Sequence, residues 1–167
     1  MSESMIRIRP IREGDEQQVA EVNENLNSPH APADLAAVIK IIEESQRSLN
    51  EGPTTKIVLV AEQFPLDDPS NATILANGTL SKMGADGTMP ILWRQEEDGS
   101  LSQFTHNEPT LEFGGMVRHK DTKVKGLGKG ISVARALIAT QFAELFKPMR
   151  SIGMNSRYWV EYVVDCG

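Results

Sequence analysis

The sequence has little cysteine, no long apolar run and no excess of positive charge, and each absence excludes a class of protein. A single cysteine in 167 residues, Cys166, excludes an internal disulfide and fits a reducing compartment. No apolar run approaches the ~20 residues of a membrane-spanning helix, and the first residues lack the apolar core of a signal peptide. The sequons at Asn71 and Asn77 therefore carry no weight. We expect a cytoplasmic protein that does not bind membranes.

Length and composition are those of one globular domain. The chain is 40% hydrophobic and 24% charged, which is ordinary for a globular protein. A chain of this size buries about two-thirds of its unfolded surface. No repeat, linker or low-complexity segment divides it. The expected domain is therefore the whole of residues 1–167.

The charges are distributed unevenly. Residues 118–150 contain eight Lys and Arg against two acidic residues, although the whole chain has a net charge of −6. A nucleic-acid-binding protein is more often basic overall, so nucleic acid is not an expected partner. A single basic segment favours a compact polyanionic ligand, and a solvated charged loop is the alternative.

Residues 121–130 combine a glycine-rich turn with lysines, directly before a helical pattern at 131–139. The glycines occupy alternate positions and allow backbone N–H groups to approach an anion at a helix N-terminus. The glycines are Gly126, Gly128 and Gly130, and the lysines are Lys123, Lys125 and Lys129. We call residues 121–130 the glycine–lysine turn, and its composition predicts a pyrophosphate site.

The spacing of these glycines excludes two common phosphate motifs. A P-loop requires Gly-x4-Gly-Lys-Ser/Thr, which does not occur. The dinucleotide fingerprint requires a third glycine where the chain has Ile131. The pattern that remains is basic-x-x-Gly-x-Gly at a helix start. Residues 123–128 fit it, and residues 125–130 fit it in a second register.

The first half of the chain predicts a strand, two helices and a hairpin. Residues 5–12 alternate apolar and basic side chains, as in a half-exposed strand, and Asp15 is expected to cap the next helix. A second helix covers residues 34–49. Its expected apolar face consists of Leu35, Val38, Ile39, Ile42 and Leu49. The apolar run 56–61 predicts a buried strand that pairs with residues 72–80.

The second half predicts a hairpin or loop, then a strand, a helix and a last strand. Residues 83–109 are expected to lie over a cleft. The strand 111–117 contains Gly114 and Gly115, which predict a β-bulge there. A helix over 129–146 has an expected apolar face of Ile131, Ala134, Ile138, Phe142 and Leu145. With a strand over 149–154, the pattern is a mixed α/β sandwich.

The glycine–lysine turn, its position after a strand and the order of elements together resemble the GNAT superfamily of acyl-CoA-dependent N-acyltransferases. The opening residues 6–12 with Asp15 are also similar to the family's first strand and helix start, so the resemblance spans most of the chain. The arginine N-succinyltransferase branch looks most similar. The residues that match its run without a gap are Glu112, Asp121, Lys123, Gly126, Gly128, Ser132, Arg135 and Phe142.

The resemblance implies a three-layer α/β/α sandwich with a β-bulged central strand, and acetyl-CoA or succinyl-CoA as co-substrate. The pantetheine arm would lie between the bulged strand and the last strand, which splay apart. The implied cofactor contacts are Met116, Val117, Lys123, Val124, Lys125, Gly126, Leu127, Gly128, Lys129, Gly130 and Asn155. A small-molecule amine or amino acid would attack the thioester directly. No protein nucleophile or metal is needed, and no residue cluster has metal-ligand spacing.

Two residues are candidates for proton transfer in such a site. Glu112, on the bulged strand, is the expected base, and a solvated strand carboxylate is the alternative. Tyr162, seven residues after Asn155, has the spacing of the family's acid for the thiolate. The alternative is that Tyr162 packs with Tyr158 and Trp159 as a core aromatic.

The sequence ends five residues after Tyr162, whereas relatives continue with a full helix and further strands. We therefore expect a fold that is short at its C-terminus. This leaves a second hypothesis, a non-catalytic CoA-binding or partner-binding remnant of the fold. A homo-oligomer that completes the sheet with a neighbouring chain is a further possibility.

Overall fold

The structure of the chain is a computed structural model that describes residues 3–26, 31–50, 56–83, 91–96, 98–105, 110–141 and 151–154. Its elements are β1 (Ser4–Pro10), α1 (Glu16–Asn23), α2 (Leu35–Asn50), β2 (Lys56–Pro65), β3 (Thr73–Met83), β4 (Ile91–Gln95), β5 (Leu101–Thr105), β6 (Thr110–Arg118), α3 (Leu127–Gln141) and β7 (Ser151–Met154). The order agrees with the one predicted from the sequence. Within residues 83–109, the strands β4 and β5 form a hairpin.

Five strands form one sheet in the order β1-β2-β3-β6-β7. Neighbouring strands are antiparallel except for β6 and β7, which run parallel. The predicted pairing of residues 56–61 with 72–80 is confirmed, since Val58 of β2 lies opposite Thr79 of β3. The β4–β5 hairpin is a separate two-stranded sheet.

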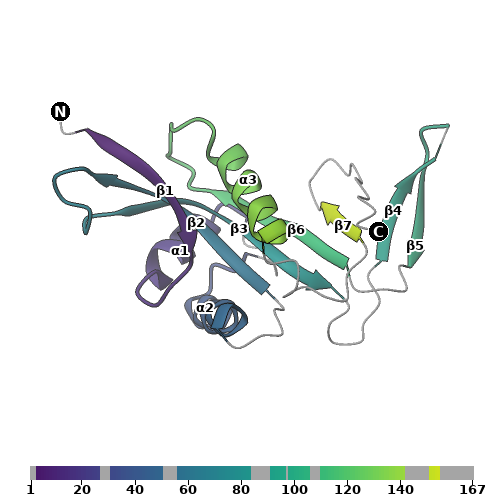
Figure 1. The fold of residues 1–167 in the computed structure, drawn as a ribbon, viewed down its shortest axis with the longest axis horizontal. Helices are drawn as coiled ribbons and strands as arrows, with labels where there is room; N and C mark the ends of the chain where they lie inside the picture. The colour runs from purple at the N-terminus through teal and green to yellow at the C-terminus, as the bar shows by residue number, and fades with distance from the viewer. Residues whose placement is uncertain are drawn as a thin grey trace.

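Helices cover both faces of the sheet (Figure 1). On one face, α1 and α2 bury Val22 and Val38 against Val60 of β2 and its neighbours. On the other face, α3 packs against a second cluster that includes Leu59 and Leu80. This arrangement confirms the three-layer α/β/α sandwich. In the described part of the chain, no helix is both long and apolar enough to cross a membrane.

The apolar face predicted for α2 was only partly right. Val38 and Ile42 are buried, whereas Leu35, Ile39 and Leu49 are exposed. The buried stripe continues through Ser45, whose Oγ accepts the N–H of Val58 at 3.0 Å. Because this hydroxyl accepts a backbone hydrogen bond from β2, a serine can occupy a position on the inner face of the helix. The apolar pattern alone therefore does not predict which face of α2 is turned towards the sheet.

The capping role predicted for Asp15 was wrong. Asp15 stands at the N-cap of α1, but its side chain makes no capping hydrogen bond. Its carboxylate instead accepts Nη1 and Nη2 of Arg9, at 2.7 and 2.8 Å, and the backbone N–H of Arg12. The ion pair with a strand residue therefore fixes α1 to β1 more directly than a cap would.

A buried carboxylate connects β1 and β2. Glu62 is 1% exposed, and its oxygens accept hydrogen bonds from Arg7 and Arg9. Burial alone would raise the pKa of Glu62, but the hydrogen bonds and charges of the two guanidinium groups outweigh burial and hold the pKa below its usual value. Glu62 is therefore charged near neutral pH and binds the two strands and α1 into one ionic cluster.

Candidate functional site

The strand β6, which lies between β3 and β7 in the sheet, contains the predicted β-bulge, one residue later than expected. Asn77 lies opposite Val117 and Thr79 opposite Gly114, so Gly115 and Met116 together oppose Gly78. Gly115 has φ 58°, a left-handed conformation that glycine adopts without strain. The bulge therefore lies at residues 115–116 rather than 114–115.

Gly78, opposite the bulge, is required for helix packing and was missed by the sequence analysis. A Cβ at this position would lie 2.6 Å from Cγ2 of Ile131. The helix α3 thus contacts the backbone of β3 directly. The only sequence signal was an isolated glycine within a strand, which marks a close approach without identifying what approaches.

The edge of β6 that faces β7 changes along its length. β7 pairs with Thr110 through Phe113, and the last pair of the described residues is Phe113 with Met154. From Gly114 to Arg118, no strand of the described part pairs with this edge. The bulge lies at the start of this stretch, so backbone N–H and C=O groups there can pair with an extended ligand.

The loop after β6 is fixed to the sheet before it enters α3. The N–H of His119 donates to the carbonyl of Leu75 at 2.7 Å, and Nδ1 of His119 accepts the N–H of Asp121 at 3.2 Å. Val124 and Leu127 then pack with Leu75 in an apolar cluster. These contacts hold the glycine–lysine turn in place. The side chains of Val124 and Leu127 thus pack against the sheet.

The first turn of α3 presents backbone donors at its N-terminus. The first helical hydrogen bond runs from the N–H of Gly130 to the carbonyl of Gly126, at 2.9 Å. The N–H groups of Leu127, Gly128 and Lys129 precede this bond and have no acceptor within the helix. Unpaired donors at the positive end of a helix dipole can bind phosphate, so we call these three N–H groups the candidate anion site, or anion site for short.

A different physical reason favours glycine at each of the three glycine positions of the turn. Gly126 has φ 84°, a backbone conformation that favours glycine. A Cβ at Gly128 would lie 3.3 Å from Sδ of Met116. A Cβ at Gly130 would lie 2.9 Å from Cδ1 of Ile8 in β1, so Gly130 allows α3 to pack on the sheet. Gly130 thus has a packing reason that the sequence analysis did not anticipate.

The lysines of the turn are exposed. Lys123, Lys125 and Lys129 all lie on the surface, and none forms an ion pair with another residue in the described part. Their ammonium groups are available to a ligand as point charges. Three cations beside three backbone donors are an arrangement that suits a diphosphate.

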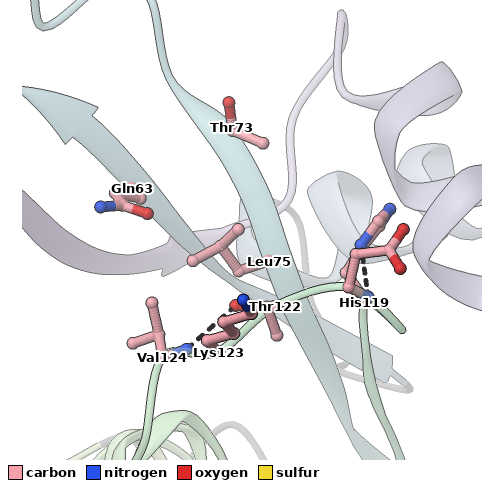
Figure 2. Close-up of a pocket in the computed structure, with 8 residues that line it drawn as sticks. Gln63, Thr73, Leu75, His119, Thr122, Lys123 and Val124 are labelled. Atoms are coloured by element: carbon pink, nitrogen blue, oxygen red, sulfur yellow. Dashed lines mark hydrogen bonds between the residues drawn. The ribbon is translucent and has the colours of Figure 1, made fainter.

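A pocket of about 570 Å³ borders the turn (Figure 2). Its lining residues are Gln63, Thr73, Leu75, His119, Asp121, Thr122, Lys123 and Val124. The pocket shares only Lys123 and Val124 with the predicted cofactor contacts, and none of its lining residues comes from β6 or β7. It therefore lies beside the anion site rather than along the edge of β6 from Gly114 to Arg118.

The remaining predicted residues fall into two groups. Met116 is 43% exposed and faces Gly128, whereas the side chain of Val117 is 4% exposed and lies in the α1–α2 core, so only the backbone of Val117 can contact a ligand. Glu112 is described through its backbone, which pairs with Ser81 and Gly153.

The predicted contact Asn155 and the predicted acid Tyr162 lie outside the described residues, as do Phe142 and Leu145 of the predicted helix face. Within the described part, no group of three or more His, Cys, Asp or Glu side chains is placed to hold a metal ion. The described site therefore consists of the anion site, the lysines and the edge of β6.

No family model and no curated protein matches this sequence. Solved structures do match it in fold. A GNAT family acetyltransferase from Staphylococcus aureus is 14% identical, with a TM-score of 0.52 over 100% of this chain and 98% of that chain. The aminoglycoside N-acetyltransferase AAC(6')-Iy in complex with CoA is 13% identical, with a TM-score of 0.54 over 93% and 80% of the two chains.

Glucosamine-6-phosphate N-acetyltransferase from Arabidopsis thaliana is likewise 13% identical, with a TM-score of 0.54 over 92% of this chain and 84% of that chain. At such identities the likeness concerns the arrangement of helices and strands. The chain has the fold of the GNAT acetyltransferases.

Proposed function

We propose that this protein is an acyl-CoA-dependent N-acyltransferase that transfers an acetyl or succinyl group to a primary amine. The observation that carries the proposal is the start of α3. Three outward backbone N–H groups and three exposed lysines meet there, directly after a bulged strand. The similarity in fold to acetyltransferases, one of them in complex with CoA, supports the same conclusion.

The diphosphate of CoA fits the anion site. The N–H groups of Leu127, Gly128 and Lys129 would donate to its oxygens, and the exposed lysines would neutralise its charge. The pantetheine arm would then extend along β6 from Gly114 to Arg118, where no described strand occupies the edge. An amide-containing arm can pair there as an added strand does.

The thioester supplies the activated acyl group. The nitrogen of the amine attacks its carbonyl carbon, so that an N–C bond forms and the C–S bond breaks. We propose that Glu112 takes the proton of the ammonium, directly or through water, and that Tyr162 protonates the thiolate. The enzyme's further contribution is to hold the two substrates in reacting geometry.

The acceptor and the acyl group are a finer proposal. The match of Glu112, Asp121 and Arg135 to the arginine N-succinyltransferase run supports arginine as acceptor and succinyl-CoA as donor. The single cysteine supports a cytoplasmic setting. A neighbouring chain that completes the sheet beside β7 belongs to the same proposal.

Two measurements test the proposal. Calorimetric titration with CoA, acetyl-CoA and succinyl-CoA measures binding, and release of free thiol with a panel of primary amines, arginine included, measures transfer. Binding with turnover is the expected result. Binding without turnover would identify the non-catalytic alternative, and no binding of any acyl-CoA would reject both.

A pair of lysine variants locates the site. Lys123→Ala with Lys125→Ala is expected to weaken CoA binding by about tenfold, since each exposed cation contributes a factor of about three. Lys40→Ala is the control, because Lys40 is also exposed but lies on α2, across the sheet. Equal losses in the two variants would contradict the assigned site. The difference should shrink at high salt, which screens exposed charges.

A further inference from the structure

A positively charged side chain lies in the core beneath the bulge. Arg135 of α3 is 1% exposed, on the inner stripe of the helix between Ile131 and Ala139. Its Cζ lies 5.4 Å from the centre of the Phe113 ring, which belongs to β6. The sequence analysis expected only apolar residues on this face, so a guanidinium at its centre requires a separate explanation.

The contacts of Arg135 are with backbone carbonyls. Nη1 donates to the carbonyls of Thr79 and Gly114, both at 3.1 Å, and Nη2 donates to Oγ of Ser132 at 3.2 Å. Nε has no partner, and no carboxylate of the described part forms an ion pair with the guanidinium. Burial lowers the pKa of Arg135 to about 10, so the group is still charged at neutral pH.

The two carbonyls lie at one point of the sheet. Thr79 and Gly114 are opposite each other, and they form the last regular pair before Gly115 and Met116 bulge away from Gly78. A bulge interrupts the ladder of hydrogen bonds between two strands. One nitrogen of Arg135 bridges both strands at this interruption.

Filling of space does not explain an arginine here. A methionine has a similar length and would fill the same volume without carrying a charge into the core, where charges are costly unless they are paired. What distinguishes arginine is a planar fork of donors that reaches several acceptors at once. The hydrogen-bond donors of the guanidinium therefore explain an arginine at this position, and Nη1 donates to the two carbonyls beside the bulge.

We propose that Arg135 is a positioning residue that fixes the bulge of β6 from the α3 side. It holds the Gly114 carbonyl toward α3, and this sets the orientation of the backbone from Gly115 to Val117. This stretch is the edge of β6 on which we propose that the acyl-CoA arm binds, so the inference rests on the proposed function. Arg135 does not touch the substrates and acts only through the backbone that it orients.

The test compares Arg135→Met with Ile138→Ala, a variant of the same inner face that leaves the guanidinium in place. Amide hydrogen exchange of Gly115, Met116 and Val117 is measured together with the free energy of unfolding. In Arg135→Met, these amides are expected to exchange roughly tenfold faster or more, beyond the change in global stability, because hydrogen bonds to a charged donor are lost. In Ile138→Ala, they should change only in step with global stability.

Arg135→Lys provides a second measurement if Arg135→Met does not fold. A single ammonium keeps the charge but lacks the fork, so exchange at the bulge should again be faster than in the wild type. Wild-type exchange in either folded variant would overturn the proposal, whatever the activity.

Binding of CoA separates this inference from the proposed function. Arg135→Met is expected to bind acyl-CoA roughly tenfold more weakly than Ile138→Ala does, with a larger effect on KM than on kcat. Faster exchange with unchanged affinity would contradict a role in binding. If the wild type itself binds no acyl-CoA while exchange at the bulge rises in the variants, the positioning of the bulge is supported and the proposed function fails.

Discussion

At the scale of single residues, Gly126 shows how one backbone angle can expose the N–H groups of an anion site. Gly126 turns the chain into α3 with φ 84°, and its carbonyl accepts the first hydrogen bond of the helix. The next three N–H groups therefore point out of the helix start. A Cβ at this position would meet no atom within 4 Å apart from its chain neighbours, so it is the backbone conformation that favours glycine.

Gly126→Ala is therefore expected to cost about 1 kcal/mol of stability, the typical cost of a left-handed conformation for an L-residue, and to weaken CoA binding. Gly14→Ala is the matched control, because Gly14 has φ 94° with open space around it but lies before α1. Thermal unfolding and calorimetric titration measure the two effects. Loss of CoA affinity in both variants, or in neither, would contradict the role assigned to Gly126.

At the scale of elements, the ionic cluster of β1, β2 and α1 makes stability depend on pH. Glu62 is buried and its pKa lies below the usual value in the folded protein, whereas the unfolded chain has the ordinary value near 4.5. The unfolded state thus binds a proton more readily than the folded state does. The contribution of Glu62 is present above the ordinary pKa and is lost as the pH falls through the lower folded pKa.

The free energy of unfolding is therefore expected to fall as the pH drops from about 5 towards 3. Glu62→Gln should destabilise the protein at neutral pH by about 2 kcal/mol, because hydrogen bonds to two guanidinium groups lose their charge, and it should flatten the acid-side slope. Urea titrations at several pH values measure both. Glu43→Gln is the control, since Glu43 is exposed on α2. An unchanged slope in Glu62→Gln would show that other groups cause the acid instability.

At the scale of the whole molecule, local patterns predicted the layers but not the contacts between them. Apolar periodicity and glycine placement were enough for the element order, the β2–β3 pairing and the helix start at the glycine–lysine turn. The rotation of α2 was missed, because the Ser45 hydroxyl satisfies a backbone donor in β2 and so occupies an inner position. The burial of Arg135 was missed because its acceptors, Thr79 and Gly114, lie on two other elements.

Gly78 is the clearest case of information that only the tertiary structure holds. Its missing Cβ admits Ile131, and Ile131 precedes Arg135 by one turn on the face of α3 that meets the bulge. The distance between α3 and β3 at this point determines where the N-terminus of α3, and with it the anion site, lies relative to β6. Packing at Gly78 thus links the core to the proposed binding of CoA.

Gly78→Ala is expected to destabilise the protein by about 1–3 kcal/mol, the usual cost of overpacking a core. The new Cβ would lie 2.6 Å from Cγ2 of Ile131, and a β-branched side chain on a helix cannot rotate away. Gly78→Ala combined with Ile131→Ala removes the clash, so the pair should be destabilised less than the sum of the two single variants. A double-mutant cycle from urea unfolding measures this coupling. Additive effects would mean that α3 shifts to accommodate the new Cβ without strain. CoA affinity in Gly78→Ala would then stay at the wild-type value.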